Sequence, residues 1–233
     1  MWDEIVTYWQ QEGTIMTPMV SLLLESILVT LYMTLVSTVA AYILGLPMGI
    51  AMVVSAPDGL RPNHVVYRIL DFIVNVVRSV PFLILLILVI PLTRAIVGKA
   101  YGPTATIVPL VLAAAPFIAR MVESSLLEVD RGVIEAAQSM GANLWTIIWK
   151  VMLAEARTSL IVGATIVLGT VLGYSAMAGI VGGGGLGDVA IQYGYYRYDK
   201  EVMWTSVILL VVLVQLMQYA GTVLSKKTDK RVR

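Results

Sequence analysis

The chain has 233 residues, of which 58% are hydrophobic and only 13% are charged; its mean hydropathy is +0.85 and its formal net charge is +1. A soluble domain would carry roughly a quarter charged residues, so the composition predicts an integral membrane protein. The absence of cysteine and the single histidine, His64, exclude disulfides, Cys-based metal sites and two-histidine metal motifs, and the charge gives no reason to expect a nucleic-acid partner.

Long charge-free stretches predict the membrane helices. A crossing needs roughly 20 apolar residues at 1.5 Å each, and all but one of these stretches are long enough. The stretch between Arg78 and Arg94 is too short, so the second helix is expected to begin near Arg68. The sequence therefore predicts an all-α integral membrane protein with one transmembrane domain over 22–225 and five spans at about 22–54, 68–91, 104–123, 159–178 and 201–224.

Basic residues predict the orientation. The N-terminal tail, 1–21, is acidic and lacks the basic start of a cleavable signal peptide. It shares its side of the membrane with only a few basic residues, which are Arg94, Lys99, Arg197 and Lys200. Most of the others lie on the opposite side, so the positive-inside rule places the tail 1–21 in the periplasm and the C-terminus in the cytoplasm. The loop 124–157 and the basic tail 226–233 are then cytoplasmic, and the tail is expected to contact inner-leaflet lipid.

Two features stand out in the first two spans. Gly45-Leu46-Pro47 is expected to kink the long first helix near its cytoplasmic end. The second helix carries Asp71, Asn75 and Arg78 on one face. Such a stripe either lines a polar interior or partner contact, or forms a local ion pair at the inner interface; we favour the ion pair. A short outer loop, 91–103, is expected before the third helix.

The fourth predicted span contains two features with alternative interpretations. Gly169-xxx-Gly173 permits close helix approach, either within one subunit or between two copies. Met177 lies near the outer end of this span. A flexible apolar side chain there could close a pore by dewetting, or could simply pack in the bundle.

The loop 124–157 contains Glu135-Ala136-Ala137, three further residues, and then Gly141. Glu135 can present a charge, the two alanines permit close approach, and Gly141 lets the chain turn sharply. Asn143 can cap the helix that follows. The pattern predicts a short helix across the membrane face, either seated in a partner's groove or lying in the interface as part of an amphipathic pair.

This spacing of Glu-Ala-Ala and Gly, two spans before the C-terminus, resembles the membrane subunits of type I bacterial ABC importers. The family usually ends the loop with a proline where this chain has Ala154. Further segments resemble the methionine-importer permease branch, and the resemblance covers about 22–221. These segments are 78–82, 90–94, 115–123, 173–179, 181–188 and 193–195.

The resemblance implies a multi-pass permease of the bacterial inner membrane that is not itself an enzyme. It implies a second copy of the chain, two ABC ATPase subunits and a periplasmic substrate-binding protein as partners. ATP and Mg would act in the ATPase, and no cofactor would bind this chain. The implied cargo is an amino acid, methionine in its L and D forms, with another amino acid or small nutrient as the alternative. The implied ATPase-coupling residues are Glu135, Ala136, Ala137 and Gly141, and the candidates for a gate or pathway are Tyr174, Ser175 and Met177.

A glycine run follows the fourth span in the predicted periplasmic loop: Gly182, Gly183, Gly184, Gly185 and Gly187. No Gly-Lys-Ser/Thr follows and no strand precedes it, which excludes a phosphate-binding loop and a dinucleotide fingerprint. Gly185-Leu186-Gly187-Asp188 also matches a motif of intramembrane aspartyl proteases, with Asp199 as a second carboxylate. Both aspartates fall in one outer loop, whereas such enzymes need two facing carboxylates within the membrane. We therefore favour a flexible, tightly turned segment beneath the binding protein and keep the protease as an alternative of another class.

Overall fold

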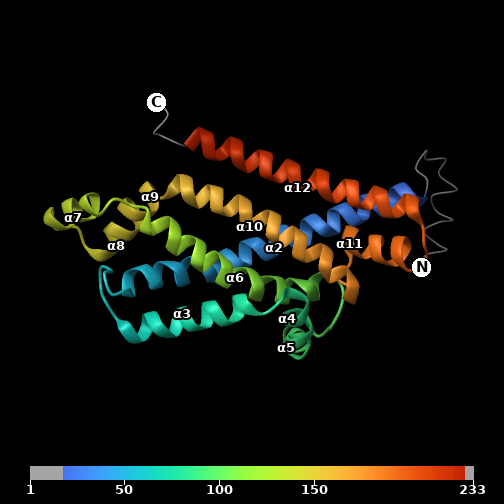
Figure 1. Cartoon of the computed structure of the whole chain (residues 1–233), viewed down its shortest axis with the longest axis horizontal. Helices are drawn as coiled ribbons and strands as arrows, with labels where there is room; N and C mark the ends of the chain where they lie inside the picture. Colours follow the sequence, from blue (N-terminus) through green and yellow to red (C-terminus); the bar gives the residue numbers. More distant parts are fainter. Residues whose placement is uncertain (1–17, 229–233) are drawn as a thin grey trace.

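The computed structural model describes residues 18–228, and all the regular structure in that part of the chain is helical. Its frame is a bundle of long helices (Figure 1). We call the end of the bundle that carries α7 the α7 end, and the opposite end the α11 end. The long helices are α2 (Pro18–Ser55), α6 (Pro103–Leu127), α10 (Arg157–Ala178) and α12 (Lys200–Thr228).

Shorter helices join the long ones. On one side of the bundle, α3 (His64–Ser79) is followed by α4 (Phe82–Leu88) and α5 (Ile90–Val97). The predicted outer loop 91–103 therefore contains most of α5. The α7 end holds α7 (Arg131–Ser139), α8 (Leu144–Thr146), the π-helix η1 (Ile147–Met152) and α9 (Leu153–Glu155). The α11 end holds the 3-10 turn η2 (Gly179–Val181), α11 (Gly185–Val189) and the π-helix η3 (Ala190–Tyr195).

The structure supports four to five membrane spans. Four helices, α2, α6, α10 and α12, are long and apolar enough to cross a membrane, and α3 with α4 makes a fifth only if a bend of 104° is allowed within it. The predicted span 68–91 is therefore not one straight helix. Val80 is extended (φ −81°, ψ 125°) and Pro81 lacks an N–H, so the helix cannot continue through them.

Close approach of α2 to α6 is the main packing contact of the bundle. A Cβ at Gly45 would lie 2.6 Å from the Ala115 carbonyl oxygen, and one at Gly49 would lie 2.6 Å from that of Ala119. Two glycines four residues apart on one face therefore let the helix backbones touch, as small residues do in membrane bundles. We expected Gly45-Leu46-Pro47 to kink this part of the first span. In the structure α2 continues as one helix through Pro47.

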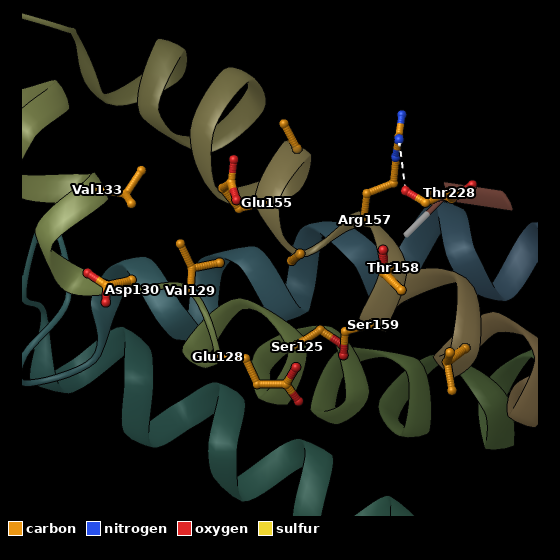
Figure 2. A pocket seen from close by; sticks show the side chains of 13 residues that line it. Ser125, Glu128, Val129, Asp130, Val133, Glu155, Arg157, Thr158, Ser159 and Thr228 are labelled. Carbon is orange, nitrogen blue, oxygen red and sulfur yellow. Dashed lines mark hydrogen bonds between the residues drawn. The ribbon is translucent and has the colours of Figure 1, made fainter. Parts of the chain in front are cut away.

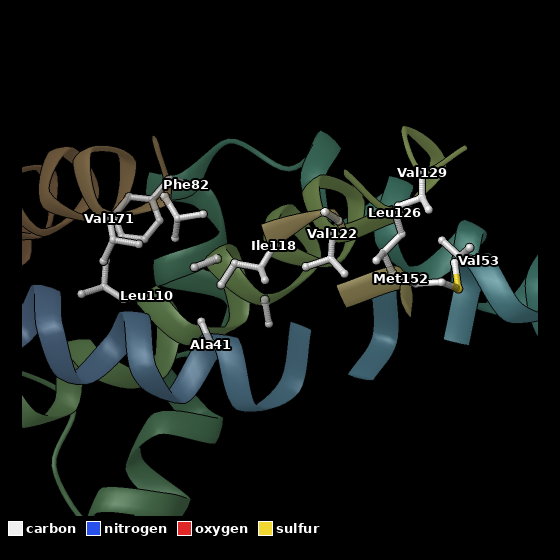
Figure 3. Close-up of a cluster of buried hydrophobic side chains, with 14 of the residues drawn as sticks. Ala41, Val53, Phe82, Leu110, Ile118, Val122, Leu126, Val129, Met152 and Val171 are labelled. Carbon is white, nitrogen blue, oxygen red and sulfur yellow. The ribbon is translucent and has the colours of Figure 1, made fainter. Parts of the chain in front are cut away.

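The hydrophobic core lies along the α2–α6 contact and extends to α10 and α4 (Figure 3). From α6 it takes Leu110, Ile118 and Val122, from α10 Val167 and Val171, and from α4 Phe82, all of them buried. By contrast, the only fully buried residue of α3 is Val74. That helix is thus peripheral, and Val74 packs in a small separate cluster with Met52 of α2 and Ala119 of α6.

Candidate functional site

The turn after α7 has the local structure that its sequence predicts. Asp130 caps α7, its Oδ1 accepting from the Gly132 N–H at 2.6 Å. Gly141 lies in the left-handed region at φ 78°, and its N–H donates to the Gln138 carbonyl. Asn143 caps α8 by accepting from the Thr146 N–H at 2.8 Å. A short helix, a sharp glycine turn and a capped second helix therefore stand at the α7 end.

The two alanines of α7 point in different directions. Ala137 is only 5% exposed and packs into the core, where its carbonyl accepts from the Ala142 N–H. Ala136 is exposed, and so are Val133 and Met140, the latter by 81%. Because these three follow one another at helical spacing, they form one apolar stripe, which we call the α7 stripe. The sequence reasoning missed Met140, although its place just before Gly141 puts it at the tip of the turn.

Glu135 lies beside a cavity of about 350 Å³ between α7 and the loop that follows α2. Its carboxylate is on the exposed side of the helix. Across this cavity Arg131 pairs with Asp58 at 3.5 Å, and both side chains are largely exposed. An exposed pair of this kind adds little stability, so it contributes little to the position of α7 relative to that loop.

A larger cavity, of about 550 Å³, opens at the α7 end between the last turn of α6 and the first turn of α10 (Figure 2). Its polar lining includes Glu128, Asp130 and Glu155, and one cation, Arg157. Arg157 donates to the Thr228 carbonyl of α12 at 3.3 Å. Val162, one turn into α10, also lines the cavity and connects it to the face described next.

One face of α10 is left exposed by the other helices of residues 18–228. It consists of Val162, Ile166, Gly173 and Met177, which we call the open face of α10. A Cβ added at Gly173 would meet no atom within 4 Å, whereas one at Gly169 would lie 3.5 Å from Gln218 of α12. Of the two glycines of the predicted motif, Gly169 therefore faces α12 and Gly173 lies on the open face. The open face runs from the larger cavity to Met177, which is 46% exposed.

The three candidate gate residues are placed differently. Met177 lies on the open face. Tyr174 is half-buried and stacks on Phe82 of α4, with ring centroids 4.5 Å apart and planes 3° apart. Ser175 is buried, and its hydroxyl donates to the Leu172 carbonyl at 2.7 Å. Of the three, only Met177 thus lies on the open face of α10, whereas Tyr174 packs against α4.

The polar stripe of α3 forms an ion pair between helices rather than the local ion pair that we favoured, because the partner of Asp71 is Arg120 of α6. Arg120 of α6 donates from Nη2 to Asp71 Oδ1 at 2.5 Å and to Asn75 Oδ1 at 2.9 Å. From Nη1 it donates to Glu123 Oε2 at 2.6 Å. Glu123 is 5% exposed, so the cluster extends from the edge of the bundle into its interior. The third stripe residue, Arg78, lies over a ring of α6, with its guanidinium carbon 5.9 Å from the Phe117 centroid.

The glycine run is tightly packed rather than loose. Gly183, Gly185 and Gly187 are buried, whereas Gly182 and Gly184 are partly exposed. Thr30 of α2 accepts from the Leu186 N–H at 2.9 Å, and a Cβ at Gly185 would lie 2.5 Å from the Thr30 hydroxyl. The glycines therefore allow the backbone of this segment to enter the bundle beside α2. The segment is tightly turned, as expected, with positive φ at Gly182, Gly184 and Gly185, and it also packs against α2.

The two aspartates of the protease alternative have different surroundings. Asp199 caps α12, its Oδ1 accepting from the N–H groups of Glu201 and Val202. Asp188 is partly buried and its Oδ1 has no hydrogen-bond partner. Burial raises the pKa of Asp188, and a hydrogen bond from Gln192 lowers it by less. A search of residues 18–228 finds no group of three His, Asp or Glu side chains that could hold a metal ion.

Replacing Asp188 by asparagine should raise thermal stability at neutral pH and leave uptake unchanged. Because the folded state raises the pKa of this carboxyl, folding favours the protonated form, and stability should increase as the pH falls through that pKa. Asparagine at position 188 is uncharged at every pH, so the Asp188→Asn variant should lack this increase in stability at low pH. Melting curves of the purified protein between pH 4 and 8 would test it, with Asp199→Asn as the control. Equal pH dependence in wild type and Asp188→Asn would contradict the prediction, and loss of a peptidase activity on this change would revive the protease.

Comparisons with known proteins agree over most of the chain. The family model described as binding-protein-dependent transport system inner membrane component matches residues 41–233. A protein of Vibrio cholerae serotype O1 named "Probable D-methionine transport system permease protein MetI" is 49% identical over 210 residues, 90% of this chain and 93% of the relative. Escherichia coli K12 MetI, named a D-methionine transport system permease protein, is 50% identical over 162 residues, 70% of this chain and 75% of the relative. A solved inward-facing MetNI methionine ABC transporter contains a chain that is 48% identical with a TM-score of 0.90, covering 93% of this chain and all of that one.

Proposed function

Because the chain belongs to the family of binding-protein-dependent transport system inner membrane components, we propose that it forms half of the pathway of an ATP-driven methionine importer. It is a permease subunit of the type I ABC importers and not an enzyme. The proposed cargo is methionine, in the L and D forms. The proposed cargo rests on the identity of 49%, over nearly the full length, to a relative named for D-methionine transport.

We infer that α7 is the coupling helix, which seats in a groove of a separate ABC ATPase. Glu135 and Ala136 are exposed, and the turn at Gly141 sets the angle at which the helix is presented. Ala137 takes another role, since it holds α7 against the core. The α7 stripe adds an apolar surface, and a protruding apolar side chain in a desolvated groove is a typical interface anchor. ATP and Mg would act in that ATPase, whose closed state would stabilise one opening of the permease.

Replacing Met140 by aspartate should weaken ATPase binding by about 2 kcal/mol or more, because a charge would enter the apolar contact. The side chain is 81% exposed in the chain alone, so the fold should not suffer. Affinity of the purified permease for its ATPase, measured by titration in detergent, checks this. Met140→Leu keeps the apolar volume and serves as the control. If Met140→Asp binds as tightly as Met140→Leu, Met140 is outside the contact.

We infer further that a second copy covers the open face of α10. Its residues are apolar and exposed within residues 18–228, and they run from the larger cavity to the α11 end. Between two copies this face would line the pathway, and Met177 would narrow it near its outer end, with Tyr174 behind. Ser175, being buried and bonded to its own helix, is left out of this proposal.

The remaining topology is proposed from charge and packing. We propose five spans in one permease domain over 22–225, with α3 and α4 together as the second, in the bacterial inner membrane. The N-terminal tail 1–21 would be periplasmic, and the loop 124–157 and tail 226–233 cytoplasmic. The segment Gly182–Gly187 and η3 would then face a periplasmic binding protein. An exposed tyrosine-rich turn supports this surface: Tyr195, Tyr196 and Tyr198 follow the glycine run, and tyrosine is common at protein interfaces.

Co-purification tests the whole proposal. The tagged chain and its ATPase are produced together, extracted in detergent and weighed as a complex. Two permeases with two ATPases are expected, and Glu135→Lys should release the ATPases because it reverses the charge at the contact. Uptake of labelled methionine, in competition with other amino acids, then decides the cargo. A complex that forms but transports another nutrient would correct the cargo alone, and a chain that never binds an ATPase would overturn the importer.

A further inference from the structure

The cluster at Arg120 is placed where α6 leads directly into the proposed coupling helix. Arg120 lies two turns before the end of α6 at Leu127, and α7 begins at Arg131. Its guanidinium spans two helices, with Nη1 on Glu123 of α6 and Nη2 on Asp71 and Asn75 of α3. A planar fork of this kind holds two partners in fixed directions, which lysine cannot do.

The Arg120 cluster supplies the hydrogen-bonded contact of α3, beside a small apolar contact of Val74 with Met52 and Ala119. Val74 is its only fully buried residue, and much of its remaining surface is exposed. The loop before it approaches α7 at the exposed pair of Asp58 and Arg131. Asp71 and Asn75, one turn apart, therefore provide the polar anchor of α3 on α6 within the described part of the chain.

The other end of α3 reaches the candidate gate. After the bend of 104° at Pro81, Phe82 of α4 stacks on Tyr174 of α10. Tyr174 is three residues before Met177 on the same helix, about one turn away. A displacement of α3 would therefore shift α4 and, through the stacking of Phe82 on Tyr174, change the position of Tyr174.

From these contacts we propose that Arg120 is a positioning residue that clamps α3 to α6, so that movement of the coupling helix reaches Tyr174 through the α3–α4 bend. The proposal rests on the proposed function, since it assumes an ATPase acting on α7. In the clamped state α3, α6 and α7 move together. Without the clamp, ATP hydrolysis continues while the α4–α10 contact no longer follows it.

The primary test measures uptake per ATP hydrolysed by the complex of permease, ATPase and binding protein in liposomes. Asp71→Leu removes the acceptor and should lower methionine uptake per ATP by about tenfold, within the range that changes along a coupling network produce. Asp71→Asn keeps an oxygen that can accept from Arg120, as Asn75 already does, and should stay near wild type. Arg68→Gln, on an exposed position of the same helix, is the matched control.

A second variant controls for loss of uptake caused by misfolding. Arg120→Lys keeps the charge but lacks the fork, so it should fold normally and still lower uptake per ATP. Unchanged uptake per ATP in both Asp71→Leu and Arg120→Lys would overturn the clamp. So would equal losses of uptake and hydrolysis with an unchanged ratio, because a purely structural role predicts that result.

A measurement without transport separates this proposal from the proposed function. Amide hydrogen exchange of α3 in the purified permease should become about tenfold faster in Asp71→Leu, while α6 stays protected. If the wild-type complex takes up no methionine but α3 exchange depends on Asp71, the clamp holds and the cargo is wrong. If uptake is normal and α3 exchange is the same in wild type and Asp71→Leu, the clamp is wrong and the importer stands.

Discussion

Replacing Gly141 by proline is expected to reduce ATP-driven uptake to background while the membrane fold remains. Gly141 has φ 78°, and its N–H donates to the Gln138 carbonyl. Proline fixes φ near −65° and has no N–H, so it can satisfy neither requirement, at a cost of about 3 kcal/mol or more. Since the turn is at the end of the bundle, the loss should be confined to the geometry of α7. Uptake and ATPase co-purification measure it.

A matched control exists at the opposite end of the molecule. Gly98 also has a positive φ, 77°, and its N–H donates to the Arg94 carbonyl. Neither glycine has any atom within 4 Å of an added Cβ. Gly98→Pro should therefore carry the same local defect without losing the ATPase. If Gly141→Pro, or the charge reversal Glu135→Lys, supports normal ATP-driven uptake, α7 is not the coupling helix.

Replacing Gly49 by leucine should prevent accumulation of folded permease. The first side-chain carbon alone would lie 2.6 Å from the Ala119 carbonyl oxygen and 2.7 Å from the Val122 Cβ. Overpacking of a tight contact costs about 1–3 kcal/mol, and here one neighbour is backbone that cannot rotate away. The higher helix propensity of leucine stabilises by only about 1 kcal/mol, so the clash should make the net effect on folding stability destabilising. Melting temperature and the yield of monodisperse protein in detergent report the effect.

Gly173 provides the contrast for this prediction. It too is a helical glycine, but an added Cβ would meet nothing within 4 Å. Gly173→Leu should leave the fold of the single chain intact and, if a second copy covers the open face, should weaken the pairing of copies. Equal yields of Gly49→Leu and Gly173→Leu would mean that the α2–α6 approach is not the principal packing contact.

Much of this protein could be predicted from local sequence. Composition and charge-free stretches predict a helical membrane protein, and residues 18–228 contain four helices long and apolar enough to span a membrane, with a fifth if α3 and α4 are joined. The turn at Gly141 and the cap at Asn143 were predicted because each depends on a few neighbouring residues. Pro81 also signalled the break between α3 and α4, since the residue before a proline disfavours helix, but the length of the apolar stretch concealed it.

The sequence by itself thus determined the class of protein, the apolar helices and the local turn at Gly141, because these follow from hydropathy and from backbone preferences of adjacent residues. Only the tertiary structure decided that Ala137 faces inward while Met140 protrudes, and that Arg120 is the partner of Asp71. It also decided that Gly45 and Gly49 bring α2 against the backbone of α6, whereas an added Cβ at Gly173 would meet no atom within 4 Å. These outcomes depend on which helices become neighbours, and that choice is made by the packing of segments far apart in the chain.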